Sequence, residues 1–180
     1  MSGQNFIVPA RSWDNIEQFA QGWRSRFGLD QTPYTPIMEM MERVLDNTLN
    51  CFTLVPMEMS EMGPAEGYTD PDGTCIMLRE DVYRGAWAGE PRDRFTAAHE
   101  LAHWAIHTNI PLARAGPSQS IPAYRLSEPQ ANQFASELLM PARFFTRFDD
   151  VHTVMDRHGV GYQAASNRLE YLGRKGKIAA

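Results

Sequence analysis

The sequence predicts a single α+β domain in which several helices pack around a small antiparallel or mixed sheet. Apolar residues recur at helical spacing in the first third of the chain and again in its second half. Two short β-rich runs lie between these regions, CFTLVPM (51–57) and CIMLR (75–79). The length of 180 residues is enough for one domain with a substantial core.

Composition and charge argue against several classes of protein. The chain is 43% hydrophobic and 22% charged, which is ordinary for a globular domain. No apolar run reaches about eighteen residues, so no membrane association is predicted. The N-terminus lacks the pattern of a signal peptide, and two cysteines are too few for a disulfide framework, so we expect a cytoplasmic protein. The net charge of −5 makes direct nucleic-acid binding by the whole surface unfavourable.

The first third of the chain is predicted to form two helices. Ser12 is placed to cap the first helix, Gly28 to end it, and Pro36 to open the second. Their apolar faces comprise Trp13, Ile16, Phe19, Ala20, Trp23 and Phe27 in the first helix, and Ile37, Met40, Met41, Val44 and Leu45 in the second. Residues 1–34 are assigned to an N-terminal helical extension.

The second half is predicted to be mostly helical. After the turn Asp70-Pro71-Asp72-Gly73, a long buried helix is expected over 91–108, followed by an unusually long loop over 108–127. Ser127 and Gln130 resemble a capping box that opens the next helix, which Pro141 ends. Two further helices are expected around 150–158 and 161–172.

The segment RFTAAHELAHWAIH (94–107) contains the HExxH pattern of zinc hydrolases. His99 and His103 lie one helical turn apart, about 6 Å along the axis, so their imidazoles can converge on one ion. Glu100 projects beside them as the general base. His107 lies roughly 12 Å from His99 along the axis and cannot share the same ion. We expect His107 to be a structural residue whose positive charge is favourable near the helix C-terminus.

A third metal ligand must come from another segment, because a catalytic zinc is held by three protein ligands. Glu128 and Glu137 are nine residues apart on the predicted 127–140 helix, half a turn out of phase, so only one can face the metal. Alanines surround Glu128 and permit close helix packing, whereas polar residues surround Glu137. The neighbours are Ala131, Asn132, Ala135 and Leu139 around Glu128, and Gln130, Gln133 and Ser136 around Glu137. Glu128 is the predicted ligand, and Glu137 is expected to be a surface carboxylate.

HELAH followed by EPQANQFASELLMP (128–141) resembles the ImmA/IrrE family of metallopeptidases. The resemblance implies a zincin-like core over 35–149, with zinc held by His99, His103 and Glu128 and with Glu100 as the base of a gluzincin-like endopeptidase. Residues 150–180 resemble the helix-turn-helix-like end of that family and are expected to pack with the core as one unit. The implied substrate is a helix-turn-helix repressor, whose cleavage derepresses phage, mobile-element or stress-response genes.

Other roles are assigned by chemistry alone. Tyr124, Arg125 and His152 are candidate oxyanion-stabilising residues, and Asn132 is a candidate for a residue that hydrogen-bonds a metal ligand and orients it. The long loop is expected to form one wall of a cleft, with docking of the protein substrate on the C-terminal helix pair.

Two alternatives stay open. A deformylase-like metal hydrolase would take Cys51 or Cys75 as third ligand, although neither lies in the Glu-Gly-Cys motif of such enzymes. A repressor-binding or DNA-binding regulatory module with a vestigial metal site would use the 150–172 helix pair. Arg168, Arg174, Lys175 and Lys177 make this C-terminal part of the chain locally basic, as DNA binding would require.

Overall fold

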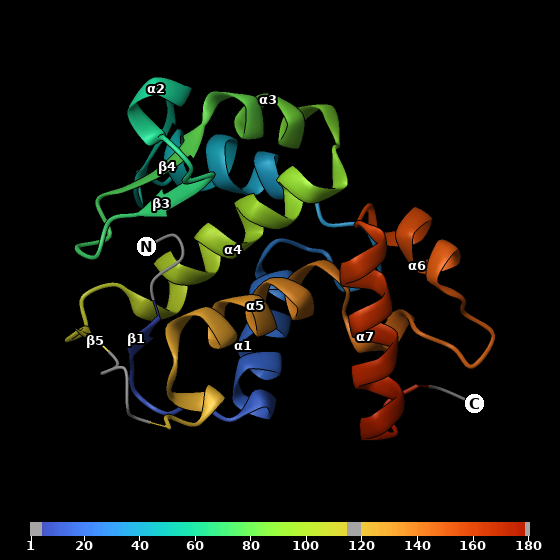
Figure 1. Ribbon diagram of the computed structural model, residues 1–180. Helices are drawn as coiled ribbons and strands as arrows, with labels where there is room; N and C mark the ends of the chain where they lie inside the picture. Colours follow the sequence, from blue (N-terminus) through green and yellow to red (C-terminus); the bar gives the residue numbers. More distant parts are fainter. Residues whose placement is uncertain (1–4, 115–119, 179–180) are drawn as a thin grey trace.

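The computed structural model describes residues 5–114 and 120–178 and confirms the α+β class. A three-stranded sheet and its covering helices form one side of the molecule, and a layer of helices forms the other (Figure 1). Helix α4 (Pro91–His107) runs between these two parts. The HExxH pattern therefore lies in the interior of the fold.

The two N-terminal helices are present as predicted. Helix α1 (Trp13–Arg26) begins after Ser12, whose Oγ accepts a hydrogen bond from the backbone N–H of Asn15 at 3.1 Å. The second helix contains η1 (Glu39–Asp46), a segment of π-helix that leads toward the sheet. Together they bury much of the N-terminal apolar surface, including Ile16 and Met41.

The sheet is mixed. Strands β2 (Thr53–Met57) and β4 (Cys75–Arg79) match the predicted β-rich runs and pair in parallel. A third strand, β3 (Gly67–Thr69), was not predicted and pairs antiparallel with β4. The short helix α2 (Met59–Met62) precedes β3, and the predicted turn joins β3 to β4, with Gly73 at φ +75°. Strand β3 is at the edge of the sheet nearest α4.

Helix α4 is preceded by α3 (Glu80–Ala88), which the sequence analysis did not predict. Gly89 ends α3 in the left-handed conformation, and Pro91 opens α4 at once. The predicted burial of α4 is confirmed, because Ala97, Leu101 and Ala102 are fully enclosed.

The connection from α4 to α5 (Ser127–Leu139) contains short ordered elements rather than a plain loop. Strand β5 (Ala113–Arg114) pairs with β1 (Phe6–Ile7), and η2 (Ala123–Arg125) precedes α5. Part of the predicted loop, residues 115–119, lies outside the described residues.

The predicted capping box at α5 is wrong. Leu126 is the N-cap, and Ser127 lies inside the helix, where its Oγ accepts a hydrogen bond from the backbone N–H of Phe6 at 3.0 Å. Gln130 is fully buried, and its side-chain amide donates to the Pro9 and Tyr124 carbonyls instead of closing a capping box with Ser127. The backbone N–H of Glu128 donates instead to Oδ1 of Asn5, next to β1, at 3.3 Å, and the sequence pattern around Ser127 gave no sign of this tertiary cap.

The C-terminal helices share the core of the protein. After η3 (Ala142–Phe144), helices α6 (Val151–His158) and α7 (Tyr162–Lys175) are joined through Gly159, which has φ +62°. The buried Arg94 of α4 donates from Nε to the Gly159 carbonyl at 3.0 Å and from Nη2 to the Thr35 carbonyl at 3.0 Å. Leu172 belongs to the same apolar cluster as the N-terminal helices. The segment boundaries at 34 and 149 stay a prediction.

Surface and helix lengths give two further findings. Within the described ranges, no helix is both long and apolar enough to cross a membrane.

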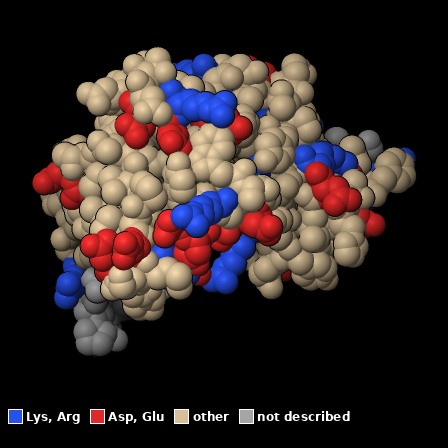
Figure 2. Space-filling model, turned by 90° about the horizontal axis from the view of Figure 1, so that it is seen from above, with Lys and Arg blue, Asp and Glu red and all other residues tan. Residues whose placement is uncertain are grey.

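On the face seen in Figure 2, basic and acidic side chains are interspersed rather than separated by sign. The described residues form ion pairs such as Arg92–Glu66 and Arg84–Glu80.

Candidate metal centre

Side chains from α4 and the first turn of α5 converge at one point. The Nε2 atoms of His99 and His103 are 3.0 Å apart. Glu128 Oε2 lies 3.2 Å from His99 Nε2, and Glu128 Oε1 lies 3.3 Å from His103 Nε2. One ligand atom from each of the three residues lies within 4.8 Å of the others. Ala131 and Ala135 are fully buried, and their small side chains let α5 approach α4 closely.

The arrangement of lone pairs fits a cation. His99 Nδ1 is 3.1 Å from Asn132 Oδ1, so its Nδ1–H donates and its Nε2 carries a bare lone pair. Glu128 Oε1 is buried and has no hydrogen-bond partner among the described residues. Electron-rich atoms this close repel one another unless a positive charge lies among them. Two imidazoles and one carboxylate are also a common donor set for catalytic zinc.

The pKa shifts of Glu128 and His103 favour the forms that bind a metal, whereas the shift of His99 favours its protonated form. Burial raises the pKa of Glu128, but the adjacent His103 and His99 rings outweigh it and lower that pKa to about 2. Burial lowers the pKa of His103. Burial also lowers the pKa of His99, but the nearby Glu128 and Glu100 carboxylates raise it overall. An ionised carboxylate and a neutral imidazole are the forms that bind metals.

Glu100 is held against the edge strand β3. Its side chain is buried, and Thr69 Oγ1 lies 2.7 Å from its Oε2 and 2.9 Å from its backbone carbonyl. A Cβ on Gly67 would lie 2.5 Å from Glu100 Cγ, so the strand leaves room for this side chain only because residue 67 is glycine. Gly67 and Thr69 were missed by the sequence analysis, since a three-residue strand carries little periodic signal.

His107 does not belong to the three-residue group, as the helical geometry predicted, but its expected charge is wrong. Burial, followed by the neighbouring His103, lowers the pKa of His107 to about 3, so the ring is neutral at physiological pH. Its Nδ1 lies 3.0 Å from His103 Nδ1, and its Nε2 lies 3.1 Å from Gln130 Oε1. The ring is enclosed beneath α5 and cannot carry a solvated positive charge at the helix end.

Glu137 is not a surface carboxylate. It is 2% exposed and forms an ion pair with Arg168 of α7, and Gln133 Nε2 donates to it at 2.7 Å. The polar neighbours of Glu137 indicated solvent, but the Arg168 side chain of α7 reaches Glu137 and pairs with it. Glu137 lies outside the three-residue group, which agrees with the predicted difference in phase.

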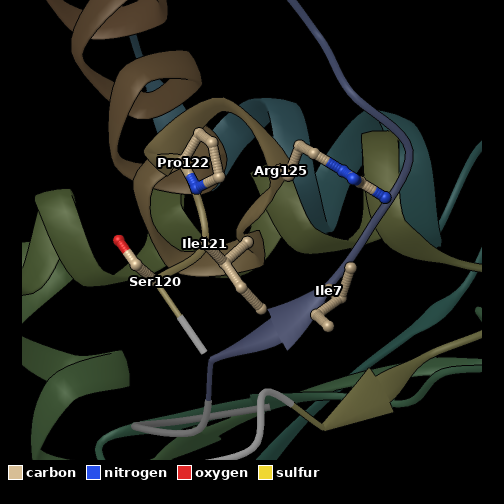
Figure 3. Close-up of a pocket in the computed structure, with 5 residues that line it drawn as sticks. All are labelled: Ile7, Ser120, Ile121, Pro122 and Arg125. Atoms are coloured by element: carbon tan, nitrogen blue, oxygen red, sulfur yellow. The ribbon is translucent and has the colours of Figure 1, made fainter. Parts of the chain in front are cut away.

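The remaining predicted residues are distributed around the site. Asn132 contacts His99, whereas Tyr124 is largely exposed and Arg125 lines a separate pocket of about 300 Å³ with Ile7 of β1 (Figure 3). His152 is exposed on α6. Within the described ranges, none of the last three predicted residues hydrogen-bonds to the His99, His103 and Glu128 group.

The cysteines required by the deformylase-like alternative do not join the group either. Cys51 is exposed and Cys75 lies on β4, and the metal-ligand group found in the described part of the chain consists of His99, His103 and Glu128.

Residues 58–170 match the family described as IrrE N-terminal-like domain, Peptidase_M78. This chain belongs to that metallopeptidase family. The match covers more than half of the chain and includes β3, α4 and α5, which supply Thr69, Glu100 and the side chains of His99, His103 and Glu128. It confirms the family resemblance, and it supports a peptidase that acts with a metal on a protein substrate. Comparison with curated proteins gave no match.

Proposed function

We propose that this protein is a zinc-dependent endopeptidase with a zincin-like core, in which His99, His103 and Glu128 hold Zn²⁺ and Glu100 is the general base. The observation that carries the proposal is the convergence of three ligand atoms beside a buried carboxylate. Glu100 follows directly after a ligand on α4, which is the spacing that the HExxH pattern needs.

Glu100, Thr69 and Asn132 have separate roles in the proposed reaction. Zinc, when bound, supplies a Lewis acid and lowers the pKa of water to about 7. Glu100 takes a proton from the attacking water and delivers it to the leaving amine nitrogen. Thr69 donates to Glu100 and restrains the carboxylate in one orientation. Asn132 accepts from His99 Nδ1–H and directs the other nitrogen toward the ligand group.

The metal site is tested by metal content and by single substitutions. We expect one zinc per chain, lost on chelation. His99→Ala, His103→Ala and Glu128→Ala should each abolish stoichiometric binding, whereas the exposed His152→Ala should keep it. Glu100→Gln should keep the metal and abolish cleavage, since it preserves the shape and removes the base. A zinc content unchanged in all three alanine variants would reject the site.

We further propose that the substrate is a helix-turn-helix repressor, cut once in an exposed segment. The family membership supports this substrate class, and a surface hollow supports docking beside the site. The hollow, about 260 Å³, runs from Asn132 on α5 to Arg174 on α7. A protein that binds α7 would thus lie next to the ligand-bearing helices, and specificity would come from contacts outside the catalytic residues.

Docking is tested by reversing one charge. Arg174→Glu should weaken cleavage of a purified helix-turn-helix repressor encoded next to this chain, with little effect on a short peptide. Arg84→Glu is the matched control, because both arginines are exposed and both follow a glutamate by four residues on a helix. Equal effects of the two variants would argue against docking on α7. Salt-sensitive binding of duplex DNA without any cleavage would instead favour the regulatory-module alternative.

A further inference from the structure

A continuous chain of hydrogen bonds runs from the ligand His103 to the backbone beneath α5. His103 Nδ1 lies 3.0 Å from His107 Nδ1, and His107 Nε2 lies 3.1 Å from Gln130 Oε1. Gln130 Nε2 in turn lies 3.0 Å from the Pro9 carbonyl and 2.7 Å from the Tyr124 carbonyl. The side chains of His103, His107 and Gln130 are fully buried, so water does not compete for these bonds.

The two backbone carbonyls fix the direction of every bond in the chain. A carbonyl oxygen can only accept, so both hydrogens of the Gln130 amide point at Pro9 and Tyr124. The opposite amide orientation would place Oε1 against two carbonyl oxygens and remove the Gln130 donor from the Pro9 carbonyl, which is costly in a buried site. Gln130 Oε1 therefore faces His107 and accepts the hydrogen of its Nε2.

The direction of the hydrogen bond between His107 and His103 follows in the same way. Among the described residues, the hydrogen-bond partners of the buried His107 ring are His103 and Gln130, and neither is a carboxylate, so the ring is neutral and its Nδ1 carries a lone pair. That lone pair accepts from His103 Nδ1–H. His103 is then left with a bare Nε2, which faces His99 and Glu128.

We propose that His107 and Gln130 are positioning residues that set the tautomer of His103 and hold its Nε2 lone pair toward the metal site. This inference rests on the proposed zinc site. It gives the third histidine of the motif a role distinct from both ligation and simple packing. Outer-shell partners of this kind typically change metal affinity by about 10- to 100-fold.

The variants separate the hydrogen bond from the space that the ring fills. His107→Phe keeps an aromatic ring and removes the acceptor for His103, whereas His107→Asn offers an amide oxygen near the position of Nδ1. Ile106→Val is the control for a small loss of buried volume on the same turn of α4, because Ile106 is buried in the apolar cluster. Zinc dissociation constants are measured by chelator competition, and folding of each metal-free protein by thermal melting.

We expect His107→Phe to weaken zinc binding by about 10- to 100-fold, with His107→Asn and Ile106→Val within a few-fold of the unmodified chain. Nitrogen-15 NMR of histidine-labelled protein should show the His103 proton on Nδ1, with and without zinc. A His107→Phe dissociation constant within twofold of the unmodified value, or a bare Nδ1 on His103, would overturn the proposal.

The NMR measurement also separates this inference from the proposed function. If the unmodified chain binds no zinc, the proposed function fails, while a proton on His103 Nδ1 in the metal-free protein still supports the hydrogen-bond chain. If His107→Phe does not fold, the tautomer and the affinity of His107→Asn decide the question.

Discussion

Arg168 and Glu137 form a buried ion pair that joins α7 to the helix that carries Glu128. Arg168 Nη1 lies 2.7 Å from Glu137 Oε1, and both side chains are 2% exposed. Arg168 Nε also donates to the Met140 carbonyl at 2.9 Å. Helix α7 therefore helps to hold α5 in place. Removal of α7 would leave the Glu137 carboxylate without its ion-pair partner.

Glu137→Ala should destabilise the protein by about 3–5 kcal/mol, because it leaves the Arg168 charge buried without a partner. Arg168→Met should cost a similar amount for the reverse reason. The double variant Glu137→Met/Arg168→Met should recover much of the loss, since no charge is then buried alone. Urea unfolding of the four proteins measures these effects. Single variants that unfold at the unmodified midpoint would show that the pair contributes nothing.

Thr69→Val should lower the turnover number by about 10- to 100-fold and leave the zinc content unchanged, because Glu100 loses the donor that restrains its carboxylate. Thr69→Ser keeps the hydroxyl and should stay near the unmodified rate. Gly67→Ala perturbs the same carboxylate from its other side and should also reduce turnover. Steady-state peptide cleavage and metal analysis check this, and full activity of both Thr69→Val and Gly67→Ala would disprove the contact's role.

Asn132→Ala should weaken zinc binding by about 10- to 100-fold, because the His99 ring loses the acceptor that orients it. Ser136→Ala is the matched control, as it lies one turn further along the same face of α5 and lines the same hollow. Chelator competition at constant pH provides the comparison. Similar affinities for both variants would mean that packing alone orients His99.

The sequence was sufficient for the ligand geometry, because that geometry is local. Helical spacing places His99 and His103 on one face of α4, and the phase difference between Glu128 and Glu137 follows from the same period. The three side chains do converge, and Glu137 lies apart from them. When two residues lie on the same helix, their spacing in the sequence is sufficient to predict their relative positions.

The residues that hold the site side chains in position were not predicted, because they act through contacts between residues far apart in the sequence. Thr69 and Glu100 come from different elements, and Gln130 donates to the backbone carbonyl of Pro9, near the N-terminus. The polar residues around Glu137 are typical of a solvated surface, but Glu137 itself is buried against Arg168. Local pattern cannot distinguish a polar residue that faces water from one that faces a buried partner.

His158 provides the last prediction, which concerns pH. Burial, outweighing its hydrogen bond to the Pro33 carbonyl, lowers the pKa of His158 to about 4. The ring stacks on Phe145, its Nδ1 lies 3.1 Å from the Pro33 carbonyl, and its buried Nε2 has no partner among the described residues. The His158 imidazole therefore stays neutral in the folded protein over a pH range in which the same imidazole is protonated in the unfolded chain, where its pKa is about 6.5.

Stability contributed by the neutral His158 should be fully present above about pH 6.5 and should fall as the pH decreases toward 4, by at most about 3 kcal/mol in total. His158→Asn keeps an N–H donor and cannot take up this proton, so its stability should fall less over the same interval. His152→Asn on the same helix is the control and should follow the unmodified protein. Urea unfolding of metal-free protein at intervals from pH 7 to pH 4 gives the three curves, and because His107 is present in all of them, their differences isolate His158. Parallel curves for the unmodified protein and His158→Asn would show that His158 titrates alike in the folded and unfolded chains.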